Sequence, residues 1–232
     1  MSKFIIVCAA RTGSQMLAGV LAQHPALQAP TYNGEIFCIS KAGLCYPEIF
    51  DFVLPDNDFF GVEYWKKRAL PGHIKSAFKR CDFIKLLYYH LNPELLDCLK
   101  DYTLIHLKRR NKLSRFFSAR IAEDRIGNSK HPYKCNYSYS GQKIKIDPIS
   151  LQSSVKWHDE QEKQIDNMNP LTIYYEDNLE DNINKILSYT SLPKFDYKVE
   201  TQKIVNTKMC DLIINYDEVK EYENNYHCVR QI

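Results

Sequence analysis

The chain opens with an apolar stretch that runs into a turn and then into a helical pattern. Residues 4–10 read Phe-Ile-Ile-Val-Cys-Ala-Ala, which predicts a buried strand. The turn Arg11-Thr-Gly-Ser follows, and Met16, Leu17, Val20 and Leu21 then recur at helical spacing. A strand–turn–helix unit points backbone N–H groups and the positive end of a helix at one spot. The sequence therefore predicts an anion site, to which Arg11 adds a fixed charge with fork geometry.

This turn differs from the common nucleotide-binding loop. The pattern G-x-x-x-x-G-K-[ST] needs an upstream glycine and a lysine beside the hydroxyl. Here Ala9 and Ala10 precede the basic residue, and that residue stands before the glycine. The alternative is an ordinary strand–turn–helix unit without a ligand, because this unit is the commonest element of α/β folds.

Length and composition limit the possible classes of protein. A chain of 232 residues with 44% hydrophobic residues predicts one domain, residues 1–232, with a sizeable core. A net charge of +3 is too small to indicate nucleic acid as a partner. The first apolar run is too short for a membrane span, and no signal peptide is expected. The eight cysteines include no C-x-x-C pair, so we expect reduced thiols and a cytoplasmic location.

A second basic segment follows another apolar run. Residues 104–107 predict a buried strand, and Lys108-Arg-Arg stands where that strand would end, ahead of an amphipathic helix. Ligands of open parallel sheets bind beyond the carboxyl ends of the strands. Arg110 at the start of this helix and Ser118 two turns later could therefore both reach one phosphate. The alternative is a solvated basic helix face.

Three further residues have two interpretations each. Lys85 interrupts an apolar run and lies either at an exposed strand end or against an anion. Glu35 follows the turn Asn33-Gly34 and is either a surface residue or a general base facing the anion. His106 lies within the third predicted strand, where a core histidine is the favoured interpretation.

The rest of the chain alternates strand and helix patterns. We expect a strand in residues 82–89, an irregular acceptor-side insertion in residues 124–148, a polar helix in residues 157–168, a strand in residues 171–175 followed by a helix, and a closing helix in residues 211–226. The predicted class is α/β: a single P-loop-like domain with a central, mainly parallel sheet flanked by helices.

Taken together, these motifs resemble the sulfotransferase superfamily that uses 3′-phosphoadenosine 5′-phosphosulfate (PAPS). The nearest branch is the bacterial one with nodulation-factor and carbohydrate sulfotransferases. Arg11-Thr-Gly-Ser is similar to the family's 5′-phosphosulfate loop, and Arg110 with Ser118 is similar to its 3′-phosphate motif of Arg, seven residues and Ser. Gly34-Glu-Ile-Phe is a weaker match to the sequences of this family.

The resemblance implies PAPS as donor, PAP as product, no metal, no nucleic acid and a carbohydrate-containing acceptor. It implies catalytic roles for Glu35 as base, for Arg11 in stabilising charge on the leaving oxygen, and for Lys85 in assisting it. The implied donor-binding residues are Arg11, Thr12, Gly13, Ser14, Gln15, Met16, Arg110, Ser118 and Lys203.

One departure keeps other functions open. The family's loops carry Ser or Thr where this chain has Gln15, whose amide can still donate a hydrogen bond. The alternatives are therefore a non-catalytic nucleotide-binding protein and an atypical P-loop kinase.

Overall fold

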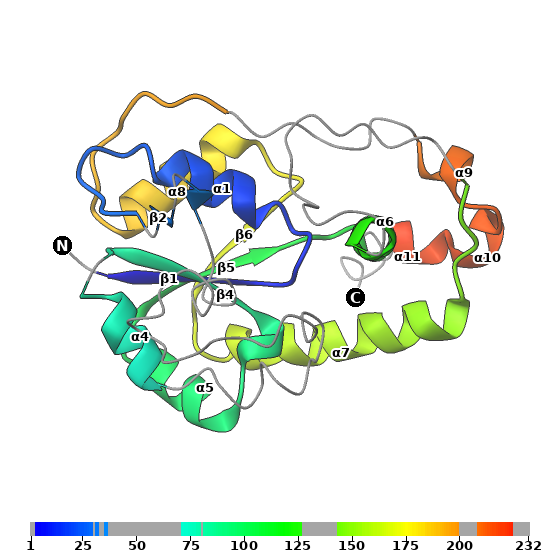
Figure 1. Ribbon diagram of the computed structural model, residues 1–232, viewed down its shortest axis with the longest axis horizontal. Coiled ribbons are helices and arrows are strands. Elements are labelled where there is room, and N and C mark those ends of the chain that lie inside the picture. The colour runs from blue at the N-terminus through cyan, green and yellow to red at the C-terminus, as the bar shows by residue number, and fades with distance from the viewer. Residues whose placement is uncertain are drawn as a thin grey trace, which may run out of the picture.

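The sheet sets the arrangement of all other elements. The computed structural model describes residues 3–29, 31–32, 35–36, 71–79, 81–126, 143–199 and 208–224. Within these ranges, parallel strands form one sheet in the order β4-β1-β5-β6 (Figure 1). Their bounds are β1 Phe4–Cys8, β4 Phe83–Leu87, β5 Thr103–Lys108 and β6 Leu171–Tyr174. The predicted α/β class with a parallel sheet is confirmed.

Helices cover both faces of this sheet and its carboxyl edge. The longer ones are α1 Ser14–Leu21, α4 Pro71–Ala77, α5 Pro93–Leu99, α6 Lys112–Ile126, α7 Pro148–Asp166 and α8 Leu179–Tyr189. The short elements are β2 Thr31–Tyr32, β3 Glu35–Ile36, a 3-10 turn Tyr88–His90, α9 Met209–Leu212, α10 Tyr216–Val219 and α11 Glu221–Asn224. Figure 1 shows α1 and α8 on one side of the sheet and α4, α5 and α7 on the other.

The alternation of side chains along β1 divides the core in two. Phe4, Ile6 and Cys8 pack with the apolar faces of α1 and α8. Ile5 and Val7 pack with α4, α5 and the end of α7. All five are fully buried, and burying such a side chain contributes about 1.5–3 kcal/mol.

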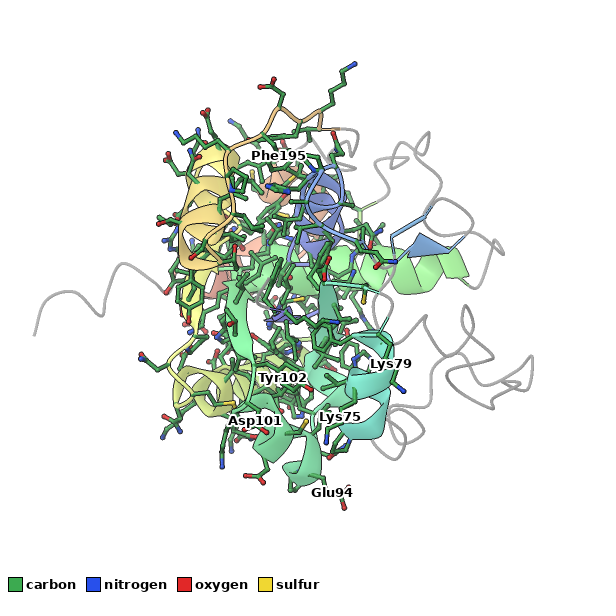
Figure 2. All side chains as sticks on the ribbon, turned by 90° about the vertical axis from the view of Figure 1, so that its left-hand side faces the viewer. Lys75, Lys79, Glu94, Asp101, Tyr102 and Phe195 are labelled. Carbon is green, nitrogen blue, oxygen red and sulfur yellow. The ribbon has the colours of Figure 1, made fainter. Side chains whose placement is uncertain are left out.

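Figure 2 labels residues of both layers. Phe195 lies at the top of the view, on the side of the sheet that α1 and α8 cover. Its ring packs edge-on against that of His24, with the two ring centroids 4.6 Å apart. Tyr102 lies with Lys75 on the α4 and α5 side, and its ring centroid is 5.1 Å from that of Phe78. Strand β1 is therefore covered by helices on both faces, which explains its lack of polar residues.

Two of the predicted boundaries are wrong. The polar helix begins at Pro148 rather than residue 157, because Asp147 caps it by accepting hydrogen bonds from the N–H groups of Ile149 and Ser150. The first residues of the predicted insertion, 124–126, belong to α6, and residues 127–142 lie outside the described chain.

The predicted closing helix is also wrong, since short helices α9, α10 and α11 replace it. The backbone between α9 and α10 pairs with a distant segment of the chain. Ile213 forms a parallel bridge with Ile144, and the N–H of Ile214 donates to the carbonyl of Ile144 at 2.9 Å. A continuous helix would need those same backbone groups for its own hydrogen bonds. The apolar residues of this region form a third cluster with α6 and the start of α7.

No helix among the described residues is both long and apolar enough to cross a membrane.

Candidate anion site at the carboxyl edge of the sheet

The turn after β1 has an unusual backbone. Arg11 and Gly13 both adopt left-handed conformations, with φ of 66° and 74°. The intervening Thr12 is buried, and its hydroxyl donates to the carbonyl of Ala9 at 2.8 Å. A left-handed conformation costs a non-glycine residue about 1–2 kcal/mol. Such strain is typical of ligand-binding turns and supports the prediction that this turn has a function.

Glycine is required at position 13 for a second reason. A Cβ atom built there would lie 2.3 Å from Cδ2 of Tyr175, the residue after β6. The ring of Tyr175 therefore occupies the space that any other side chain would need. The first helical turn of α1 starts here, where the N–H of Leu17 donates to the carbonyl of Gly13 at 3.1 Å. The first four N–H groups of a helix have no partner within it, and α1 begins shortly after β1 ends, at the carboxyl edge of the sheet.

The side chain of Arg11 is held by helix α6. Its Nε donates to Oγ of Ser118 at 3.1 Å. The sequence singled out both residues as anion ligands but placed them in separate motifs. The structure places the two motifs in direct contact, at the ends of the neighbouring strands β1 and β5.

Arg110 is also at this edge, with different partners. Its Nη1 donates to Oδ1 of Asp177 at 2.6 Å, and its guanidinium carbon lies 3.8 Å from the centroid of the Tyr174 ring. The hydrogen bond to Asp177 raises the pKa of Arg110, although burial opposes this. Sequence spacing pairs Arg110 with Ser118. Among the described residues, however, Arg110 bonds Asp177 whereas Ser118 bonds Arg11.

Glu176 fixes the backbone around Arg110. Its two carboxylate oxygens each accept a hydrogen bond of 3.0 Å, one from the N–H of Arg110 and one from that of Asn111. Asn111 in turn accepts from the N–H of Ser114 at 2.7 Å, which starts α6. The turn after β6 thus holds the turn after β5 in place.

Lys85 reaches the site from β4. It lies within the strand and is 6% exposed, so the interpretation of an exposed strand end is wrong. Its Nζ donates to Oε1 of Gln15 at 3.0 Å, in the first turn of α1. Lys85 shares a register position with Ile6, whose side chain belongs to the core on the α1 side. This explains why the lysine points toward α1.

Sequence reasoning missed Arg109 as a site residue. Its Nη1 donates to the carbonyl of Arg11 at 2.8 Å, so Arg109 contacts the backbone of the turn. The signal available was its place directly after a buried strand, which it shares with Arg110. Nothing in the spacing shows which of the two neighbouring arginines turns toward the loop.

The balance of charge around the turn favours an anion. Among the described residues, Arg11, Lys85 and Arg109 form hydrogen bonds with neutral oxygens only: a serine hydroxyl, an amide oxygen, a backbone carbonyl and a second serine hydroxyl. Arg110 is the cation here that has a carboxylate partner. Cations whose hydrogen-bond partners are all neutral attract an anionic ligand.

His106 belongs to a different polar group, on the opposite face of the sheet. It is fully buried, as the core interpretation predicts. Its Nε2 bonds the hydroxyl of Tyr88 at 2.6 Å, and its Nδ1 bonds Asp166 at 2.9 Å. Lys108 bonds the other oxygen of Asp166 at 2.5 Å. Burial lowers the pKa of His106 despite the hydrogen bond to Asp166, which favours the neutral ring of a core residue.

Two predicted site residues are placed only in part or not at all. The backbone of Glu35 lies in β3, which pairs with β2 and contacts α1, and its side chain lies outside the described residues. Lys203 also lies outside the described residues. Within the described ranges, no three His, Cys, Asp or Glu side chains are grouped so as to hold a metal ion.

No protein-family model matches the chain, and a comparison with curated protein sequences finds no match. Similar solved structures include a sulfotransferase from Alicyclobacillus acidocaldarius, 14% identical, with a TM-score of 0.48 over 89% of this chain and 87% of that one. Another is a sulfotransferase domain from the curacin biosynthetic pathway, 14% identical, with a TM-score of 0.44 over 91% of this chain and 82% of that one. Such values assign no role to any residue, so the site is assigned from its own geometry.

Proposed function

We propose that the chain is a PAPS-dependent sulfotransferase that transfers the sulfuryl group to a hydroxyl of a carbohydrate-containing acceptor. One observation carries the proposal: the left-handed turn after β1, with Arg11 and Lys85 bonded to neutral oxygens, meets Ser118 of the second basic motif at one sheet edge. A donor with a phosphosulfate at one end and a 3′-phosphate at the other needs two cationic groups in such proximity.

The residues present fit this donor. Backbone N–H groups of residues 12–16, at the turn and the start of α1, would hold the sulfonate and 5′-phosphate oxygens. Within the described residues Arg11 bonds through Nε, so its two Nη groups are available for bidentate contact with an oxyanion. Arg110 and Ser118 would hold the 3′-phosphate, and Lys203 keeps the donor-binding role that the resemblance implies.

In sulfuryl transfer, as in phosphoryl transfer, the protein mainly positions the reactants and stabilises the charge that develops. The acceptor oxygen forms a bond to sulfur while the bond from sulfur to the 5′-phosphate oxygen breaks in line. Arg11 and Lys85 stabilise the charge that grows on this leaving oxygen. Glu35 takes the proton of the acceptor hydroxyl, and β3, which carries it, contacts α1. The carbohydrate class of the acceptor rests on the sequence resemblance alone.

Calorimetry with PAP and transfer of radiolabelled sulfate from PAPS test the proposal. The chain should bind PAP, and it should label a hydroxylated acceptor from a panel of glycans and lipids. Thermal stabilisation by ATP and magnesium without stabilisation by PAP would favour a kinase instead. Binding of PAP without transfer to any acceptor, including those of a whole-cell extract, would favour a non-catalytic nucleotide-binding protein.

The role of Glu35 has its own test. Glu35→Gln should lower turnover by about 10²-fold or more, since general-base catalysis contributes about 10²–10⁴-fold. Its affinity for PAP should stay within about twofold of the original, because a base on the acceptor side does not contact the product nucleotide. Glu94→Gln is the matched control, because Glu94 is exposed on α5 (Figure 2). Equal turnover in the Glu35 and Glu94 variants would remove Glu35 as the base.

A further inference from the structure

We propose that Arg109 is a positioning residue for the anion-binding turn: its guanidinium holds the carbonyl of Arg11 and thereby fixes the left-handed backbone that aims the turn at its ligand. This inference rests on the proposed function of the turn and adds a residue to it. Arg109 reaches no ligand in this proposal. It acts through Arg11.

The guanidinium of Arg109 connects three parts of the molecule. Its Nη1 donates to the carbonyl of Arg11 at 2.8 Å, and its Nη2 donates to Oγ of Ser114 on α6 at 2.5 Å. Its central carbon lies 4.7 Å from the centroid of the Tyr175 ring. The same ring lies against Gly13, where it leaves no space for a Cβ. Arg109 and Tyr175 therefore contact both left-handed residues of the turn.

The hydrogen bond to Arg11 decides the conformation of the turn. A left-handed arginine returns to the right-handed or extended region unless its surroundings hold it. Here the carbonyl of Arg11 is held by Arg109, and its side chain is held by Ser118. With the carbonyl released, the peptide plane after Arg11 can rotate. The N–H of Thr12 and the Arg11 guanidinium then no longer point to one place.

The charge of Arg109 also acts on ligand affinity. The bonds of its two Nη groups go to neutral oxygens, while Nε is buried and has no hydrogen-bond partner within the described residues. Burial lowers the pKa of Arg109 and the charge of Arg11 also lowers it, whereas Tyr175 and the carboxylate of Glu176 raise it. Two neighbouring cations repel each other, and a bound anion removes that repulsion. The charge of Arg109 therefore adds to the attraction of the turn for an anion.

Two substitutions separate geometry from charge. Arg109→Lys keeps the charge, but a single ammonium group cannot reproduce the planar fork that spans Arg11 and Ser114. Arg109→Gln keeps one donor and loses the charge. We expect both to weaken PAP binding by about tenfold or more, as for a hydrogen bond from a charged group. The glutamine variant alone should show a smaller loss of affinity as salt is raised, because it has lost a charge near the ligand.

Thermal unfolding supplies the readout that a merely structural residue would not give. Because Arg109→Gln should bind PAP more weakly, the midpoint of unfolding of the ligand-free variant should fall less than that of its PAP complex. Arg120→Gln is the control, since Arg120 is exposed on the following helix α6 and its loss changes the net charge equally. It should leave PAP affinity within about twofold, as expected for a surface charge. Wild-type PAP affinity in both Arg109 variants would overturn the proposal.

A failure of the proposed function would be seen separately. If the wild-type chain does not bind PAP, the sulfotransferase proposal fails, and amide hydrogen exchange of ligand-free protein then tests Arg109. Faster exchange of residues 12–14 in Arg109→Lys, with β1 unchanged, would support its role in holding the turn. Unchanged exchange of these amides would overturn that role.

Discussion

Arg11 and Ser118 lie in motifs more than a hundred residues apart, yet Nε of Arg11 donates to Oγ of Ser118 at 3.1 Å. This hydrogen bond makes the turn after β1 and the helix after β5 parts of one site. It uses a single donor of a guanidinium that has five. The contact therefore orients Arg11 and leaves its remaining fork for an oxyanion.

Ser118→Ala should weaken PAP binding between about twofold and tenfold, the range expected for one hydrogen bond of about 0.5–1.5 kcal/mol. The loss reflects both a freed Arg11 and one contact fewer to the 3′-phosphate. Calorimetry measures the affinity, and Ser153→Ala, an exposed serine of α7, serves as control. If Ser118→Ala binds PAP as the control does, the assignment of the second basic motif to the nucleotide is wrong.

Two glycines of the same region should respond oppositely to alanine. Gly13→Ala combines a left-handed φ of 74° with a Cβ at 2.3 Å from Tyr175, so the turn or the ring must move. We expect a loss of stability above about 2 kcal/mol, from strain and overpacking together. Gly19→Ala, in the middle of α1 with nothing within 4 Å of its Cβ, should gain about 0.5–1 kcal/mol. Chemical denaturation of both variants checks the difference in sign.

The core of the fold could be predicted because its signals are local. Strands β1, β4 and β5 are short apolar runs, and each is followed by a turn and a helical pattern. The turn after β1 could be singled out for the same reason, since Arg11 and Gly13 lie together in sequence. The pairing of Arg11 with Ser118 could not, because it depends on β1 and β5 being neighbours in the sheet.

The missed features depend on contacts between distant segments. The end of α9 at Leu212 follows from the bridge between Ile144 and Ile213, which no local pattern contains. The orientation of Arg109 follows from Tyr175, which comes from another strand end. The start of α7 is different, because Asp147 followed by Pro148 is a recognisable helix start. The prediction missed it because the many polar residues that follow obscure the helical spacing of the apolar ones.

Stability should fall as the pH drops below neutrality, because of buried histidines. His90 is fully buried, and desolvation lowers its pKa to about 3. In the unfolded chain its pKa is about 6.5, so between these values only the unfolded state takes up the proton. Stability therefore falls as pH decreases from about 6.5, by about 1.4 kcal/mol per pH unit for each such histidine.

The variant His90→Gln tests this origin of the pH dependence. It removes one titrating group while its amide oxygen can still accept from the N–H of Leu87, the partner of His90 Nδ1. Denaturation curves between pH 7 and pH 5 should show a slope smaller by about one proton than in the wild-type chain. An identical slope would mean that His90 is protonated in the folded state.

Lys85→Met should separate the chemistry from folding. Methionine fills the space of the buried aliphatic chain without the charge, so the free energy of unfolding should change by less than about 1.5 kcal/mol. Turnover should fall by about tenfold or more, since one charge near the leaving oxygen is lost. Lys100→Met is the control, because Lys100 forms an exposed pair with Asp97. Equal turnover in the two variants would leave Lys85 with a role in holding Gln15 only.

Arg110 and Asp177 should have opposite effects on nucleotide affinity. Arg110→Gln removes a charge that would contact the 3′-phosphate in the proposed complex, and we expect PAP binding to weaken by about tenfold. Asp177→Asn keeps an oxygen that can accept from Arg110, and the stacking of that guanidinium on Tyr174 is unchanged. What it removes is a carboxylate close to where the phosphate would lie. Since the ion pair is partly exposed, little stability depends on its charge.

The asparagine variant should therefore bind PAP about two- to fivefold more tightly, and the gain should shrink as salt is raised, because screening weakens the repulsion that was removed. Asp217→Asn is the matched control, since Asp217 forms an exposed pair with Lys220. Weaker binding in Asp177→Asn would mean that Asp177 acts mainly by holding Arg110. If both Arg110→Gln and Asp177→Asn leave the affinity unchanged, the nucleotide does not reach the end of β5, and the 3′-phosphate site must lie elsewhere.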